Sequence, residues 1–179
     1  MMTGILLLSF LLTGCGSPEP QTGKKMSMYY INTAETKVEV HEQYLNTKTL
    51  DEQLDETMRY LSTTPEKLEY KAPLDMGFRV LDYEVEDGKL LINVDKAYSE
   101  LSPTTEVLVR AAIVRTLTQL PNVKYVGITV EDSQLYDNAG EMVGWMNADQ
   151  FINNDGNEIN TYELVKVKLY FANAAGDKL

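Results

Sequence analysis

The sequence predicts an α+β fold, a two-layer sandwich in which two helices lie on one face of a mostly antiparallel sheet. Three observations predict it. Several short segments alternate apolar and polar residues, as strands with one covered face do. Two longer segments repeat apolar residues at helical spacing, and one pair of strands is joined by a two-residue turn. With 179 residues, 44% of them hydrophobic, the chain is long enough for one domain with its own core.

The first two strands are expected at residues 26–31 and 37–44, with a turn at 32–35 between them. A helix follows. Thr49 and Glu52 form a capping box at its start, in which each side chain accepts a hydrogen bond from a backbone N–H. Apolar side chains then recur on one helical face, at Leu50, Leu54, Met58 and Leu61.

A hairpin is the clearest local prediction. Asp87 and Gly88 form the favoured two-residue turn, in which both positions need a positive φ. The strands on either side carry an apolar set at Leu81, Tyr83, Val85, Leu90, Ile92 and Val94, and an acidic set at Asp82, Glu84 and Glu86. The hairpin should therefore have one covered face and one acidic, solvated face.

A second helix is expected to begin at Ser102 and Pro103, which suit a cap and the first helical position. Glu106 and Arg110 lie one turn apart and can form an ion pair. The apolar stripe is broad and includes Val107, Leu108, Ala111, Val114, Leu117 and Leu120. A stripe this broad predicts burial against a sheet.

The remaining elements are strands and turns. Residues 123–130 alternate as a strand, and residues 138–140 form a turn after it. The last strand is expected at residues 164–171, where Lys166 and Lys168 give it a basic outer face.

The chain starts with an apolar run that leads to a cysteine. Residues 5–12 form this run, which has the length found in secretory signals and is much shorter than a membrane span. Thr13 and Gly14 then supply small side chains before Cys15, the only cysteine. This arrangement resembles a bacterial lipoprotein signal. The resemblance implies cleavage between Gly14 and Cys15 and lipidation of Cys15, which would anchor the protein to a membrane. No Lys or Arg precedes the apolar run, which departs from the pattern; the alternative is a buried N-terminal strand with an ordinary apolar cysteine.

These features predict four parts of the chain. Residues 1–14 are the signal peptide, 15–27 a flexible tether rich in Gly, Pro and polar residues, 28–172 the α+β domain, and 173–179 a C-terminal tail.

Residues 72–95 combine a proline, a turn and the Asp87–Gly88 hairpin, and residues 115–126 lead from the end of a helix into a strand. Both segments resemble motifs of the sporulation and spore-germination domain known as GerMN. The family commonly has Asp-Gly after that strand, whereas this chain has Asp132 and Ser133. The resemblance implies a fold like the ring-building motifs of secretion-type assemblies, an extracytoplasmic domain used for binding or assembly, and no catalytic residues.

Composition and single residues exclude several function classes. The formal charge of -11 argues against nucleic acid as a partner. One Cys and the single histidine, His41, cannot build a structural zinc site, and a satisfied or solvent-facing His41 is favoured over a catalytic one. A run of Asn, Asp and Gly at residues 153–158 fails the EF-hand pattern and favours a turn, with a weak cation site as the alternative. We therefore expect no metal and no cofactor.

The sequence is compatible with two functions. The favoured one is a lipoprotein on the outer face of the cytoplasmic membrane, held there by lipid on Cys15, whose GerMN-like domain is not an enzyme. Its expected partners are envelope proteins, in sporulation or germination, and self-association is left open. The alternative is a cell-wall peptidoglycan hydrolase that uses acidic residues such as Glu84.

Overall fold

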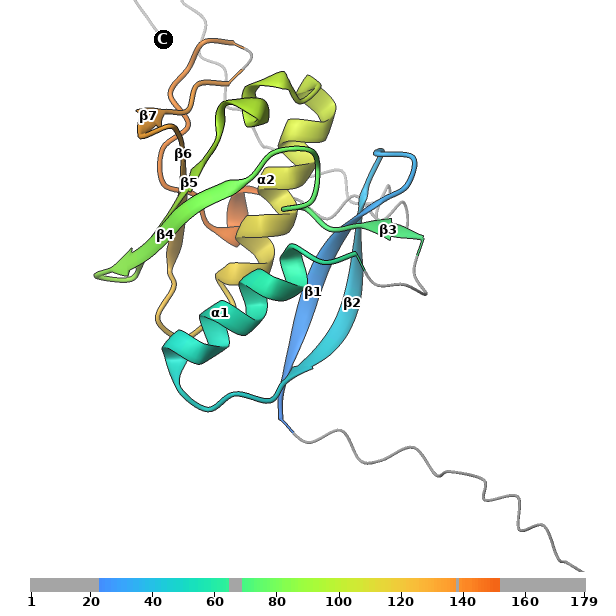
Figure 1. Ribbon diagram of the computed structural model, residues 1–179, viewed down its shortest axis with the longest axis vertical. Helices are drawn as coiled ribbons and strands as arrows, with labels where there is room; N and C mark the ends of the chain where they lie inside the picture. Colours follow the sequence, from blue (N-terminus) through green and yellow to red (C-terminus); the bar gives the residue numbers. More distant parts are fainter. Residues whose placement is uncertain (1–22, 65–68, 138, 152–179) are drawn as a thin grey trace, which may run out of the picture.

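The structure is a computed structural model that describes residues 23–64, 69–137 and 139–151 (Figure 1). Its strands are β1 (Lys24–Asn32), β2 (Val38–Leu45), β3 (Tyr70–Lys71), β4 (Val80–Glu86), β5 (Lys89–Val94), β6 (Tyr125–Val130) and β7 (Ser133–Gln134). Its helices are α1 (Leu50–Leu61), α2 (Pro103–Leu117) and the short 3-10 turns η1 (Lys96–Glu100) and η2 (Ala148–Gln150). The α+β class with two α-helices is confirmed.

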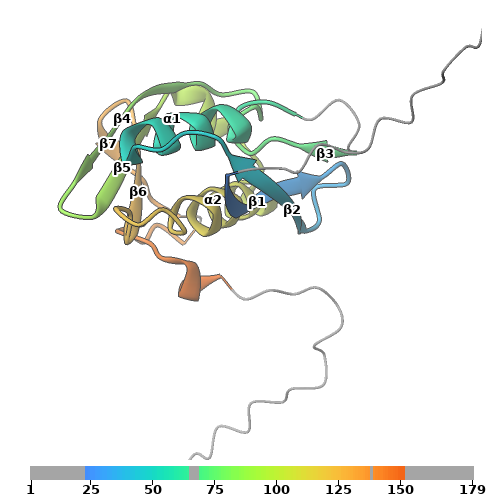
Figure 2. The same ribbon diagram turned by 90° about the horizontal axis from the view of Figure 1, so that it is seen from below.

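The strands form two sheets where the sequence predicted one. Three antiparallel strands lie in the order β2-β1-β3, and four more lie in the order β4-β5-β6-β7. The β5–β6 pair is parallel, because the chain crosses from one strand to the other through α2. The two sheets lie on opposite sides of α2. Helix α1 also lies between the two sheets, next to α2 (Figures 1 and 2).

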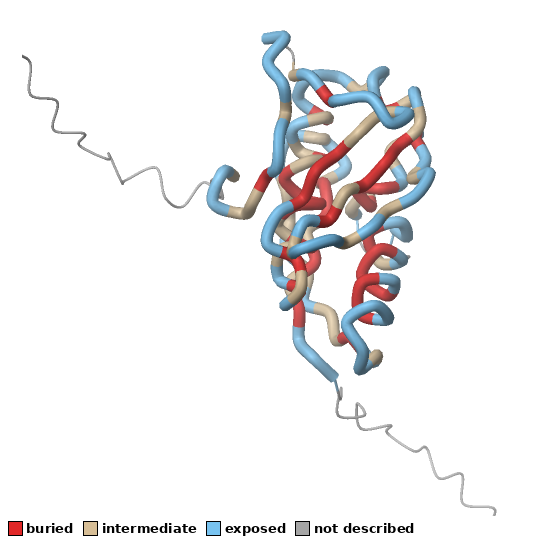
Figure 3. Tube along the Cα trace, turned by 90° about the vertical axis from the view of Figure 1, so that its left-hand side faces the viewer, coloured by how far each residue is buried: buried red, intermediate tan, exposed pale blue. Residues whose placement is uncertain are grey.

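Both helices begin as predicted. The capping box of α1 is present, with the Thr49 side chain accepting from Glu52 N–H and the Glu52 side chain accepting from Thr49 N–H. At α2, the Ser102 hydroxyl accepts from the Thr105 N–H at 3.2 Å. Buried segments gather in the interior (Figure 3), where Met58 and Leu61 of α1 and Ile113 and Leu117 of α2 share one core with the strands. Two positions of the predicted stripes, Leu50 and Val107, are exposed instead.

The β4–β5 hairpin has the predicted turn and one correction. Asp87 and Gly88 have φ values of 50° and 80°, as this turn requires. The register shifts by a bulge at Leu81, between the Val80–Val94 and Asp82–Asn93 pairs. The Leu81 side chain, predicted to face inward, is therefore exposed, and Val80 packs against the core in its place.

The free edge of β1 is closed by side chains at the end of α2 and just after it. Beyond its short pairing with β3, this edge has no strand partner among the described residues. The amide of Gln119, just after α2, takes both backbone groups of Ser27: its oxygen accepts from Ser27 N–H at 3.0 Å and its nitrogen donates to Ser27 O at 2.7 Å. Thr116 Oγ1 accepts from Tyr29 N–H at 3.1 Å. These bonds hold α2 against the three-stranded sheet.

β1 begins at Lys24, so the last four residues assigned to the flexible tether are strand residues. The signal peptide, the turn and alternative cation site at residues 153–158, and the predicted strand at residues 164–171 lie outside the described residues.

Candidate interaction surface

The outer face of the β4-β5-β6 sheet, turned away from α2, carries the most distinctive surface side chains. Leu90, Ile92, Val126 and Ile128 point inward and are buried in the core. Strand alternation places their neighbours on the opposite face. In the parallel register there, Lys89 lies opposite Tyr125, Leu91 opposite Gly127, and Asn93 opposite Thr129.

Trp145 lies over this face at Gly127. A Cβ built on Gly127 would come 2.8 Å from Trp145 Cζ3 and 3.2 Å from Leu91 Cδ1, so only glycine leaves room for the indole ring. Lys89 Nζ lies 5.4 Å from the centre of the same ring, within cation–π range. The ring covers the sheet on one side and meets solvent on the other.

The segment that carries Trp145 is held in place by backbone hydrogen bonds. Met146 and Val126 exchange N–H···O bonds of 2.8 Å in both directions. Val143 N–H donates to Leu135 O at 2.9 Å. At the tip, the Asp137 side chain accepts from two backbone N–H groups of the following turn, each at 2.9 Å. The segment is therefore an ordered edge of the sheet.

Four large apolar side chains on β6 and this segment are exposed. The exposed fractions are 41% for Tyr125, 60% for Tyr136, 58% for Met142 and 42% for Trp145. We call these four residues the aromatic surface. Aromatic and methionine side chains are enriched where proteins bind other proteins.

An acidic strip borders this face on β4. Asp82, Glu84 and Glu86 are all exposed, as the alternation predicted. Asp82 accepts a hydrogen bond from Asn93 Nδ2 at 3.1 Å. A carboxyl group that acts as a general acid is usually buried, whereas these three side chains are exposed. The strip therefore fits a solvated margin of the surface better than acid–base chemistry.

The turn between β6 and β7 directly precedes Ser133, which stands where the GerMN pattern has glycine. Glu131 and Asp132 have φ values of 48° and 63°, in the left-handed region. Asn93, 4% exposed, supports them: its Oδ1 accepts from Asp132 N–H at 3.0 Å and its Nδ2 donates to Asp132 Oδ1 at 2.7 Å. The chain therefore makes this tight turn with Glu131 and Asp132 and without glycine.

A buried charged network lies beside a small cavity of about 110 Å³ between η1, α2 and residues 135–137. Glu106 Oε1 is 2.6 Å from Arg110 Nε and accepts from Tyr98 OH at 2.9 Å. Glu106 Oε2 accepts from Arg110 at 2.9 Å. Burial, together with the Glu106 charge, raises the pKa of Tyr98 well above its ordinary value. Since the carboxylate is fully engaged, the network fixes η1 on α2 and offers no free acid.

The residues predicted from sequence to act in a site are not brought together. Gly14 and Cys15 lie outside the described residues. His41 lies on β2, its ring 6.5 Å from that of Tyr30. Among the described residues, no group of three or more His, Cys, Asp and Glu side chains could hold a metal ion, and no helix is long and apolar enough to cross a membrane.

Sequence reasoning missed the aromatic surface. Residues 135–146 show no periodicity, so nothing predicted that they would form an edge of the sheet. Two signals were available: Trp145 is the only tryptophan of the chain, and Gly127 interrupts an otherwise regular strand. A glycine inside a strand often marks a close approach by another group.

Comparison with known proteins identifies the fold. A family model described as Germane, sporulation and spore germination, matches residues 27–136. The chain belongs to the Germane family. The match covers both sheets, both helices and Tyr125 and Tyr136 of the aromatic surface, and it confirms the GerMN resemblance. No curated protein matches the Germane chain significantly.

Two solved structures share the Germane fold. The first GerMN domain of the sporulation protein GerM from Bacillus subtilis has a TM-score of 0.55 at 14% identity, covering 72% of this chain and 99% of that one. The tandem GerMN domains of the same protein give 0.53 at 18% identity, covering 79% of this chain and 51% of that one. The chain thus spans about half the length of the tandem protein. At these identities the likeness shows the fold alone.

Proposed function

We propose that the protein is a lipid-anchored lipoprotein whose Germane domain binds other proteins in the cell envelope during sporulation or germination. The observation that carries the binding role is the aromatic surface, an ordered and exposed set of large apolar side chains on a domain of the sporulation family. The anchor rests on the sequence around Cys15. The domain would then present its surface to partners from a fixed place on the membrane.

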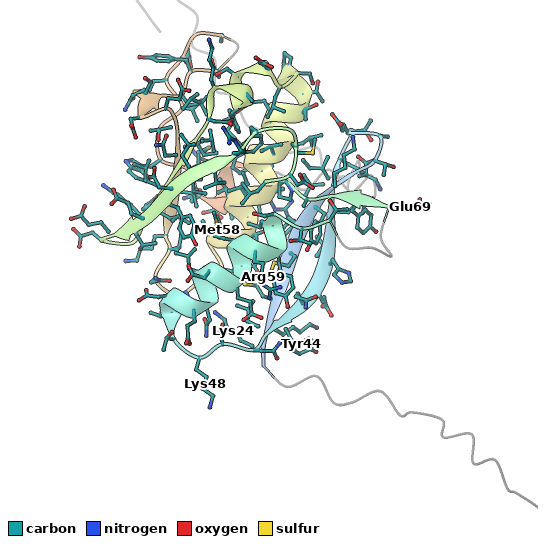
Figure 4. All side chains as sticks on the ribbon, viewed as in Figure 1. Lys24, Tyr44, Lys48, Met58, Arg59 and Glu69 are labelled. Carbon is teal, nitrogen blue, oxygen red and sulfur yellow. The ribbon has the colours of Figure 1, made fainter. Side chains whose placement is uncertain are left out.

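The position of β1 supports this arrangement. Only eight residues, 16–23, separate Cys15 from β1, and fully extended they span at most roughly 28 Å. An anchored domain would stand close to the lipid. Lys24 and Lys48 lie at the end of the molecule where β1 starts (Figure 4), whereas the loop after β7 lies at the far end (Figure 1). The tip of the aromatic surface, Tyr136 and Met142, would therefore point away from the membrane.

Cys15→Ala tests the anchor. Cells grown with a radioactive fatty acid should label the wild-type protein and not the variant, because the thiol is the only cysteine acceptor in the chain. The variant should also move from the membrane fraction to the soluble fraction. Equal labelling of both proteins would contradict the anchor and leave the binding role to be judged separately.

In-cell photo-cross-linking tests the binding role. A photoreactive amino acid at Tyr136, on the aromatic surface, should give discrete adducts of higher mass. The same probe at Val40, which is 47% exposed on β2, is the matched control and should not. Trp145→Ala should weaken adduct formation at Tyr136 by roughly 30-fold, the effect of removing an aromatic hot spot worth about 2 kcal/mol. Identical adducts at both positions, or adducts that survive Trp145→Ala, would argue against this surface.

A further inference from the structure

The last residues of the chain repeat the sequence of β1 and of the turn that follows it. Residues 165–179 align with residues 24–38 without gaps. Five of the fifteen aligned pairs are identical, namely Lys25/Lys166, Tyr29/Tyr170, Asn32/Asn173, Ala34/Ala175 and Lys37/Lys178. The sequence alone predicted one last strand and a tail here.

The burial of β1 shows what the repeat preserves. The buried residues of β1 are Met26, Met28, Tyr30 and Ile31. Their counterparts in the repeat are Val167, Leu169, Phe171 and Ala172, all apolar. Each counterpart fits a position that faces the core, while Lys166, Lys168 and Tyr170 take the positions of residues that β1 does not bury. The repeat therefore keeps an apolar residue at each buried position of β1.

The repeat has suitable residues at the two positions of the turn after β1 where the backbone geometry restricts the choice of side chain. Asn32 Oδ1 accepts from the N–H groups of Thr36 at 2.8 Å and Lys37 at 3.1 Å, and the repeat has Asn173 there. Glu35 has a φ of 52°, a left-handed conformation that costs a side chain about 1–2 kcal/mol. The repeat has Gly176 at this position, the residue best suited to it. The identity at the first position and the substitution at the second both suit the backbone geometry of this turn.

The segment between the two copies has the composition of a linker. The last described residue, Phe151, packs against the core, and residues 152–164 are rich in Asn and contain Asp-Gly. A strand with this sequence pattern would need helices and partner strands of its own, as β1 needs α1, α2 and β2. β1 already occupies its place in the first unit.

We propose that residues 165–179 open a second copy of this fold, so that the working protein carries two such units in tandem. A second unit would present a second surface from the same chain. Two linked surfaces bind a partner with repeated sites more tightly than one alone.

The mass of the intact protein in cells tests the proposal directly. Protein isolated by an antibody against the described domain should exceed the 20.2 kDa of these 179 residues by roughly 10–17 kDa, the size of one more domain of ordinary length. A mature protein no heavier than the 179-residue chain would overturn the proposal. Failure of lipid labelling or of cross-linking would not affect this measurement.

Hydrogen exchange on that isolated protein tests the structural claim. Residues 165–179 should be protected to within about tenfold of residues 24–38, since both would be strand and turn. Asn173→Ala should speed exchange in residues 165–179 by about tenfold and leave residues 24–38 unchanged, and the matched variant Asn32→Ala should do the reverse. Exchange of residues 165–179 at the unprotected rate in the wild type would overturn the proposal. So would an Asn173→Ala variant that changes neither segment.

Discussion

Replacing Glu106 by alanine is expected to lower the free energy of unfolding by about 3–5 kcal/mol. The Glu106 and Arg110 side chains are each only 13% exposed, and the carboxylate also accepts the Tyr98 hydroxyl. Removing the carboxylate leaves a buried guanidinium and a buried phenol without their partner. Chemical denaturation monitored by circular dichroism measures the loss.

A double variant separates two quantities: the destabilisation caused by leaving one buried charge unpaired, and the net contribution of the Glu106–Arg110 ion pair to stability. Glu106→Leu with Arg110→Met replaces both charges by apolar groups of similar size, and it should recover most of the stability lost in Glu106→Ala. The exposed Lys25–Glu42 pair is the control: Glu42→Ala should cost much less than Glu106→Ala, because solvent screens an exposed pair. A Glu106→Ala variant as stable as Glu42→Ala would contradict the burial of the network.

Glu56→Gln is expected to lower the free energy of unfolding by about 1.5–3 kcal/mol at neutral pH. Glu56 is 8% exposed on α1, and its carboxylate accepts from Asn46 N–H at 3.0 Å, Thr47 N–H at 3.1 Å and the Thr47 hydroxyl at 2.7 Å. These bonds fasten the loop between β2 and α1 to the helix. A neutral amide cannot accept all of them as strongly.

The effect should depend on pH. Burial acts to raise the pKa of Glu56, but the hydrogen bonds from Thr47 and Asn46 outweigh it and hold the pKa below its ordinary value. A lowered folded-state pKa stabilises the protein above the unfolded-state value, about 4.3, and this stabilisation is lost as the pH falls through the folded-state pKa. The difference between wild type and Glu56→Gln should therefore be largest near pH 7 and shrink below about pH 4.

The exposed Glu84→Gln substitution is the matched control, with an expected change within about 0.5 kcal/mol. If Glu56→Gln and Glu84→Gln had the same small effect, independent of pH, the Glu56 carboxylate would not hold the loop. Urea denaturation of the three proteins across pH 3–8 would measure both outcomes.

The sequence predicted elements whose cause is local. The capping box of α1, the Asp87–Gly88 turn and the cap of α2 each depend on a few neighbouring residues, and all three are confirmed. The bulge at Leu81 could not be predicted from the sequence, because an alternating pattern does not reveal where two strands shift in register.

Features set by distant parts of the chain were missed. The Glu106–Arg110 pair follows from helical spacing, but its burial depends on η1 and Tyr98. The division into two sheets depends on α2 passing between them, and the position of Trp145 depends on a backbone bridge to β6. Sequence reasoning therefore found the fold class and the acidic strip, and left the aromatic surface to the structure.

The amide of Gln119 has a consequence for crowded conditions. A strand with a free edge is a template on which another molecule can add a strand, and growth of this kind continues from copy to copy. On β1 the backbone groups of Ser27 are already occupied by a side chain. An amide fills one position and offers no further strand edge, so it stops such growth at β1. Many domains can then sit close together without fusing their sheets through this strand.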